Sequence, residues 1–110
     1  MTRRVPFATM SDPGARLEVS PTSTGWEVHG EIDAHTAPTL AAAMTELPEG
    51  VVTIDVAGVS FMDSSGLRVL IEAATRAREG SGDLVIVHST PGIARLVEIS
   101  GLGGQLRLED

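Results

Sequence analysis

The segment from Phe61 to Leu67, Phe-Met-Asp-Ser-Ser-Gly-Leu, carries the residues of this chain that are best suited to chemistry. Aspartate and serine both cap helices, so one explanation is that Asp63 or Ser64 accepts the first free backbone N–H groups of a helix. One cap needs only one side-chain oxygen, so the two consecutive hydroxyls of Ser64 and Ser65 are more than capping requires. Gly66 in a first helical turn also costs about 1 kcal/mol relative to alanine, and it allows close approach of another group.

A serine hydroxyl at a helix N-terminus is also well placed to accept a phosphate, because the free N–H groups and the helix dipole stabilise it. Such a phosphate would add about −1.5 to −2 charge beside Asp63. On a binding surface this charge would abolish docking without unfolding the protein. The residues alone leave both explanations open, a plain cap and a phosphorylation switch.

Other catalytic or metal-binding groupings are sparse. The three histidines share no metal-ligand spacing, and we interpret them as polar surface or strand-end residues: His29, His35 and His88. No G-x-S-x-G, H-E-x-x-H, Walker or G-x-G-x-x-G motif is present. A hydrolase with Ser64 as nucleophile would need a base in reach, and the sequence offers only these scattered histidines. We predict a protein that is not an enzyme and has no metal site and no cofactor.

Composition narrows the function further. The chain has 110 residues, no cysteine and a formal charge of −7, from 8 basic and 15 acidic residues. The length suits one domain, and the acidic balance argues against nucleic-acid binding. All basic residues are arginine, so a phosphate-binding or Schiff-base lysine is excluded. No apolar run approaches the roughly 20 residues that span a bilayer. We expect a soluble, cytoplasmic protein that binds neither nucleic acid nor membrane.

Hydrophobic periodicity predicts the elements that position these residues. Residues 1–14 are expected to be a flexible leader, and residues 15–110 a single domain. Apolar and polar residues alternate over 15–20 and 26–32 around the turn 21–25, which predicts a hairpin. Residues 51–56 and 84–87 are typical of buried strands, and 105–108 of a last short strand.

Three helices are predicted between these strands. The first begins at Thr36 as N-cap, has a stripe from Leu40 to Leu47, and stops at Pro48. The second has Gly66 in its first turn and a buried stripe formed by Leu67, Leu70, Ile71 and Ala74. The third has Thr90 as N-cap, Pro91 as its first residue and Gly101 at its end. The pattern indicates an α/β protein: a mixed sheet of four to five strands with three helices packed against it.

Four segments, in order, resemble a known family. Residues 60–67, Ser-Phe-Met-Asp-Ser-Ser-Gly-Leu, are similar to the signature of STAS-domain anti-sigma factor antagonists that control sporulation and stress sigma factors. Gly-Glu-Ile-Asp-Ala-His-Thr at 30–36, Ile-Asp-Val at 54–56, and residues 91–96 with 100–102 fit other parts of the family pattern. The resemblance covers roughly residues 15–108.

The resemblance implies a function. The first serine after the aspartate, here Ser64, is the residue that an anti-sigma factor serine kinase phosphorylates, with Ser65 a less favoured acceptor that we expect to act as a cap. The unphosphorylated form binds the anti-sigma factor and releases the sigma factor, and a PP2C-type phosphatase resets the system. The implied partner-binding residues are Asp33, Thr36, Asp63, Ser65, Gly66, Leu67 and Arg68.

One residue departs from the family pattern, and one alternative function remains open. Arg68 stands where the family often has a small residue, and it is expected to adjust partner specificity or to pair with a phosphate on Ser64. The alternative function is a STAS scaffold or sensory module of a larger signalling complex that is not phosphorylated. A scaffold is expected to self-assemble, whereas the antagonist is expected to be a monomer or weak dimer.

Overall fold

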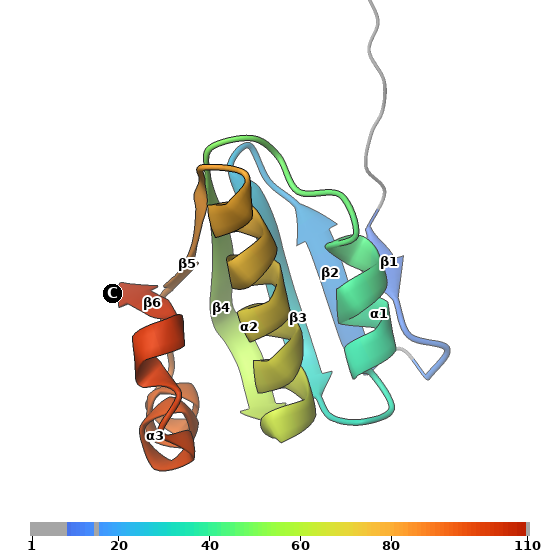
Figure 1. The fold of residues 1–110 in the computed structure, drawn as a ribbon. Coiled ribbons are helices and arrows are strands. Elements are labelled where there is room, and N and C mark those ends of the chain that lie inside the picture. The colour runs from blue at the N-terminus through green and yellow to red at the C-terminus, as the bar shows by residue number, and fades with distance from the viewer. Residues whose placement is uncertain (1–8, 15, 110) are drawn as a thin grey trace, which may run out of the picture.

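The computed structural model describes residues 9–14 and 16–109. These residues form one six-stranded sheet with helices α1 and α2 side by side over one face (Figure 1). Helix α3 contacts β4 and α2. The elements are β1 (Met10–Ser11), β2 (Leu17–Pro21), β3 (Gly25–Ile32), α1 (Ala37–Ala43), β4 (Val51–Met62), α2 (Ser64–Glu79), β5 (Asp83–Val87), α3 (Pro91–Ser100), the 3-10 turn η1 (Gly103–Gln105) and β6 (Arg107–Glu109).

The strands lie in sequence order across the sheet, and the sheet is mixed. β1, β2 and β3 are antiparallel neighbours, whereas β3, β4, β5 and β6 are parallel. The parallel pairs require crossovers, which α1, α2 and α3 provide. The carboxyl ends of β3 and β4 therefore lie at the same edge of the sheet, where Ile32 pairs with Met62.

The core lies between the sheet and the helices. Alternate residues of the strands point into it, as the hairpin pattern predicted for Trp26, Val28 and Ile32. The largest fully buried side chains come from both layers: Leu17, Ile32, Leu40, Met44, Ile54, Leu67, Leu70, Leu84 and Ile86. Burying one such leucine or isoleucine contributes about 1.5–3 kcal/mol. The α/β class is confirmed.

The sheet has six strands rather than the predicted four to five. The additional strand, Met10–Ser11, pairs with Val19 and Glu18 of β2. Most of the expected leader, residues 1–8, lies outside the described residues. Its described part is not a loose segment, because Asp12 is buried and receives the backbone N–H of Leu17 at 2.7 Å. A two-residue strand is too short for its alternation to be read from sequence.

Strand β4 is twice as long as predicted and reaches Met62, so Phe61 and Met62 belong to the strand and not to its connection. The predicted strand ends at Val56, two residues before Gly58, because the run of β-branched residues ends there. In the fold, the His29 ring of β3 lies where a side chain at position 58 would be. Glycine is therefore suited to this strand position because a neighbouring side chain covers it.

Helix α1 is shorter than predicted and ends at Ala43. A longer helix would need the N–H of residue 48 to bond the Met44 carbonyl, and Pro48 has none. Instead, the Arg76 guanidinium of α2 donates to the carbonyls of Met44 at 3.0 Å and Thr45 at 3.2 Å. Helix α3 follows its prediction, since Thr90 Oγ1 accepts the Ile93 N–H and Gly101 is left-handed with φ 75°.

Candidate functional site

The two aspartates singled out from the sequence lie at one edge of the sheet. Asp33 directly follows β3 and Asp63 directly follows the parallel β4. The Asp63 N–H donates to the Ile32 carbonyl at 3.0 Å, which fixes the two strand ends to each other. The turn into α1 and the N-terminus of α2 are therefore neighbours, although about thirty residues separate them in the chain.

Asp63 is the N-cap of α2. Its Oδ1 accepts the Ser65 N–H at 2.8 Å, and its carbonyl accepts the N–H groups of Gly66 at 3.1 Å and Leu67 at 3.2 Å. The expectation that Ser65 acts as a cap is therefore wrong, because Ser65 donates to the cap from within the first helical turn. The carboxylate and the carbonyl of Asp63 together accept the N–H groups of Ser65, Gly66 and Leu67, so neither serine hydroxyl is needed for capping.

Ser64 is the first residue of α2 and is exposed. Its hydroxyl makes no hydrogen bond to another residue in the described part of the chain. Ser65 is half-buried. An exposed hydroxyl with no internal partner is accessible to another protein, and of the two serines Ser64 is the more accessible.

Two hollows lie on either side of Ser64 and Arg68. The first, of about 410 Å³, lies between α1 and α2, and the second, of about 450 Å³, lies between α2 and the chain from Ser100 to Gln105. Ser64 and Arg68 line both. Residues that line only the first are Ala34, Ala37, Pro38, Ala41, Ser65 and Val69. We call the exposed or half-buried residues Asp33, Ala34, Ser64, Ser65 and Arg68 the Ser64 surface.

Three of the predicted partner-binding residues are buried: Thr36 (0 % exposed), Leu67 (2 %) and Gly66. They are not available for direct contact in this conformation, so their part is to shape the surface. A Cβ at Gly66 would lie 2.5 Å from Cγ2 of Ile32 and 2.8 Å from Cγ of Met62. Gly66 therefore lets the first turn of α2 pack closely on the ends of β3 and β4.

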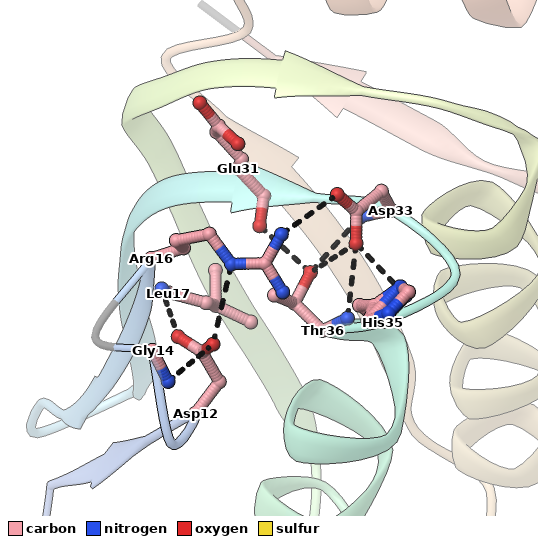
Figure 2. A network of polar contacts seen from close by, with 8 residues as sticks. All are labelled: Asp12, Gly14, Arg16, Leu17, Glu31, Asp33, His35 and Thr36. Atoms are coloured by element: carbon pink, nitrogen blue, oxygen red, sulfur yellow. Dashed lines mark hydrogen bonds and ion pairs between the residues drawn. The ribbon is translucent and has the colours of Figure 1, made fainter.

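Thr36 and Asp33 build the turn between β3 and α1 (Figure 2). The Thr36 hydroxyl donates to the Glu31 carbonyl at 2.7 Å and accepts the Asp33 N–H at 2.9 Å. Asp33 Oδ1 accepts the N–H groups of His35 at 2.9 Å and Thr36 at 3.1 Å. Thr36 precedes the helix, but its side chain does not cap it as predicted, because the hydroxyl faces back to the strand end. The backbone carbonyl of Asp33 instead accepts the N–H of Ala37, the first residue of α1, at 2.8 Å.

Arg16 connects this turn to the N-terminal segment. Its guanidinium lies 3.7 Å from Asp33 Oδ2 and 3.5 Å from Asp12 Oδ2, between the two carboxylates in Figure 2. The N–H of Thr36 holds the pKa of Asp33 below its ordinary value, with Arg16 adding to the effect. Burial raises the pKa of Asp12, but the N–H groups of Leu17, Gly14 and Arg16 outweigh it and leave the pKa lowered.

Sequence reasoning missed Asp12 and Arg16 in this arrangement. The Arg16–Asp33 ion pair joins two segments that lie apart in the chain, so no local pattern encodes it. The Asp12–Arg16 pair is local, but it lies in a segment that was expected to be a flexible leader. Asp33 is thus held as a carboxylate in a fixed orientation. Within residues 9–14 and 16–109, no three histidine or acidic side chains are grouped as a metal site would require, and no helix there is long and apolar enough to cross a membrane.

Comparison with known proteins decides the family. The family model described as "Mlab, STAS domain" matches residues 16–109. The anti-sigma-B factor antagonist of Listeria monocytogenes is 38% identical over 86 residues, covering 76% of this chain and 75% of that protein. The chain belongs to the STAS-domain family of anti-sigma factor antagonists. The family and the α/β fold predicted from the sequence are thereby confirmed.

Solved structures agree with this assignment to the STAS family. An anti-sigma factor antagonist from Mycobacterium paratuberculosis superposes with a TM-score of 0.69 at 27% identity, covering 90% of this chain and 89% of that chain. The Bacillus cell fate determinant SpoIIAA in its phosphorylated form superposes with a TM-score of 0.61 at 19% identity, over 84% and 89% of the two chains. This STAS protein is an anti-sigma factor antagonist, a regulator and not an enzyme, as predicted.

Proposed function

We propose that this STAS protein binds an anti-sigma factor serine kinase through the Ser64 surface and is released when that kinase phosphorylates Ser64. Release of the sigma factor follows from binding, and a PP2C-type phosphatase restores the binding form. The observation that carries the proposal is the exposed Ser64 hydroxyl, which has no hydrogen-bond partner among the described residues because Asp63 performs the capping.

The relatives support this proposal. The Listeria relative is named an anti-sigma-B factor antagonist, and SpoIIAA, which has the same fold, has been solved in a phosphorylated form. The signature segment around Ser64 is the part of this chain that resembles the family's phosphorylation motif. Ser65 is the alternative acceptor, and its lower exposure favours Ser64.

The transfer step needs nothing from this chain except the hydroxyl. Ser64 Oγ attacks the γ-phosphorus of ATP, an Oγ–P bond forms, and the bond from that phosphorus to the β–γ bridging oxygen breaks. ADP leaves with the electron pair, and the hydroxyl proton passes to a base of the kinase. ATP and Mg²⁺ belong to the kinase, so this protein is the substrate.

Electrostatics explain why the phosphate prevents binding. The phosphate brings about −1.5 to −2 charge to the Ser64 surface, which already holds the carboxylate of Asp33 and lies next to that of Asp63. A partner surface that matches the unmodified hydroxyl would then have to accommodate the phosphate, whose charge exceeds the single positive charge of Arg68, and burying the remaining unpaired charge is costly. The fold itself need not change.

The test uses purified anti-sigma factors encoded in the same genome, each incubated with the protein and Mg-ATP. We expect one of them to bind the unmodified protein and to place one phosphate on Ser64, located by mass spectrometry. Ser64→Ala should bind that partner and stay bound in the presence of ATP. Ser64→Asp should bind that partner with an affinity at least about tenfold lower than that of the unmodified protein.

Ser65→Ala is the matched control, because it removes the neighbouring hydroxyl and leaves the proposed acceptor. It should be phosphorylated and released like the natural protein. The proposal fails if the binding partner leaves Ser64 unmodified, or if Ser64→Ala is released by ATP. In that case the non-phosphorylated scaffold is the better description, and size-exclusion chromatography should then show self-assembly in place of a monomer or weak dimer.

We place this activity in the cytoplasm, where ATP and sigma factors are found. Antibody detection in fractionated cells should find the protein in the cytoplasmic fraction, together with its anti-sigma factor.

A further inference from the structure

Arg68 is an exposed cation of the Ser64 surface whose role the proposed function leaves open. Within the described residues its guanidinium makes no hydrogen bond and no ion pair, unlike Arg76 and Arg78 of the same helix. Glu72 lies four residues further along α2, but it is not paired with Arg68. Arg68 lines both hollows that flank Ser64.

The spacing places Arg68 next to Ser64 on one side of α2. Residues four apart in a helix have Cβ atoms about 5–6 Å apart, and an acid that is N-terminal to its base is the more favourable order. Ser64 and Arg68 have this spacing, and a phosphate on Ser64 would create this order. An arginine guanidinium binds a phosphate with two parallel N–H···O bonds, which a lysine ammonium does not do.

We propose that Arg68 is the intramolecular partner of phosphorylated Ser64 and holds the phosphate along α2, away from the Asp63 carboxylate. This inference rests on the proposed phosphorylation of Ser64. It assigns Arg68 a task in the phosphorylated protein that it does not have in the unmodified one. In the unmodified protein the guanidinium remains free for the partner.

Two consequences follow from the pairing. The guanidinium favours the doubly charged phosphate, so it lowers the second pKa of phosphoserine from its ordinary value of about 6. It also covers part of the phosphate, so a phosphatase has to displace Arg68 before hydrolysis. The arginine therefore prolongs the lifetime of the phosphorylated, non-binding form.

The test installs phosphoserine at position 64 during translation, so it does not depend on identifying a kinase. Phosphorus NMR then follows the phosphate between pH 4.5 and 8 in the otherwise natural protein and in Arg68→Gln and Arg68→Lys. We expect the second pKa to be about 0.3 unit higher in Arg68→Gln, and intermediate in Arg68→Lys. The Arg68 Nε–H resonance should shift when Ser64 carries phosphate.

Arg95→Gln is the matched control, because Arg95 is an exposed arginine of α3 that has no hydrogen bond or ion pair in the described part of the chain. It should titrate like the natural protein. The inference is overturned if Arg68→Gln also titrates like the natural protein, or if the Arg68 resonance does not respond to the phosphate. Such a result would leave the proposed function standing, because that function is tested by binding and by kinase labelling.

Discussion

The guanidinium of Arg16 lies 3.7 Å from Oδ2 of Asp33, while Oδ1 of the same aspartate accepts two backbone N–H groups of its own turn. Both carboxylate oxygens are therefore engaged before any partner arrives. Arg16 also lies 3.5 Å from the buried Asp12, so the segment before β2 is tied to the turn that carries part of the Ser64 surface.

These contacts make stability depend on pH. The pKa values of Asp33 and Asp12 are lowered in the fold, as are those of Asp55, through the Ala57 N–H, and Asp83, through the Leu84 N–H. A lowered pKa means that the unfolded chain binds more protons, so this stability is present at neutral pH and is lost on acidification. The urea midpoint should be nearly constant from pH 7 to about 5 and fall below about pH 4.

Asp33→Asn should make the urea midpoint fall less steeply below pH 4 and should lower this midpoint at pH 7, because the substitution removes one charged acceptor. Glu46→Gln is the control, since Glu46 is exposed and makes no hydrogen bond or ion pair with another described residue. It should change neither quantity. An unchanged slope in Asp33→Asn would contradict the link between this carboxylate and folding.

Gly66→Ala should destabilise the protein although alanine favours helices. The new Cβ would lie 2.5 Å from Ile32 Cγ2, and overpacking of this kind costs about 1–3 kcal/mol. Gly80→Ala, at the other end of α2, is the control, because its nearest contact would be an ordinary 3.6 Å. Thermal unfolding of both variants checks this. If Gly66→Ala melts at the same temperature as Gly80→Ala and the natural protein, the close packing at Gly66 is not needed for stability.

Thr36→Val should lower stability by about 1–3 kcal/mol, because it leaves the Glu31 carbonyl and the Asp33 N–H without the hydroxyl that bonds both. Thr36→Ser keeps the hydroxyl and should retain most of the stability. Urea unfolding monitored by Trp26 fluorescence measures both variants. If Thr36→Val is as stable as the natural protein, the two hydrogen bonds of the Thr36 hydroxyl do not contribute to stability.

Asp63→Ala should cost about 0.5–2 kcal/mol through loss of the α2 cap, whereas Asp63→Asn keeps a side-chain oxygen for the Ser65 N–H and should cost less. Amide hydrogen exchange should show faster exchange at Ser65 and in the following turn of the alanine variant. Protection equal to that of the natural protein would mean that another group caps the helix.

The sequence by itself determined the fold class, the hairpin and the third helix, and it singled out the segment around Ser64 as the candidate site. These features are local or periodic: alternation in residues 26–32, the cap at Thr90 with Pro91, and the Asp-Ser-Ser-Gly run at 63–66. The family resemblance then placed the candidate phosphate acceptor on one residue.

Tertiary structure decided the rest. Only the fold brings Arg16 to Asp33 and the end of α1 to Arg76. Only the fold also covers Gly58 with His29 and lets β4 continue to Met62. It also separates the exposed Ser64 from the buried Thr36, Gly66 and Leu67, which the family resemblance grouped together as site residues. The reason is that burial and long-range hydrogen bonds depend on which strands become neighbours, and periodicity within one segment carries no information about that choice.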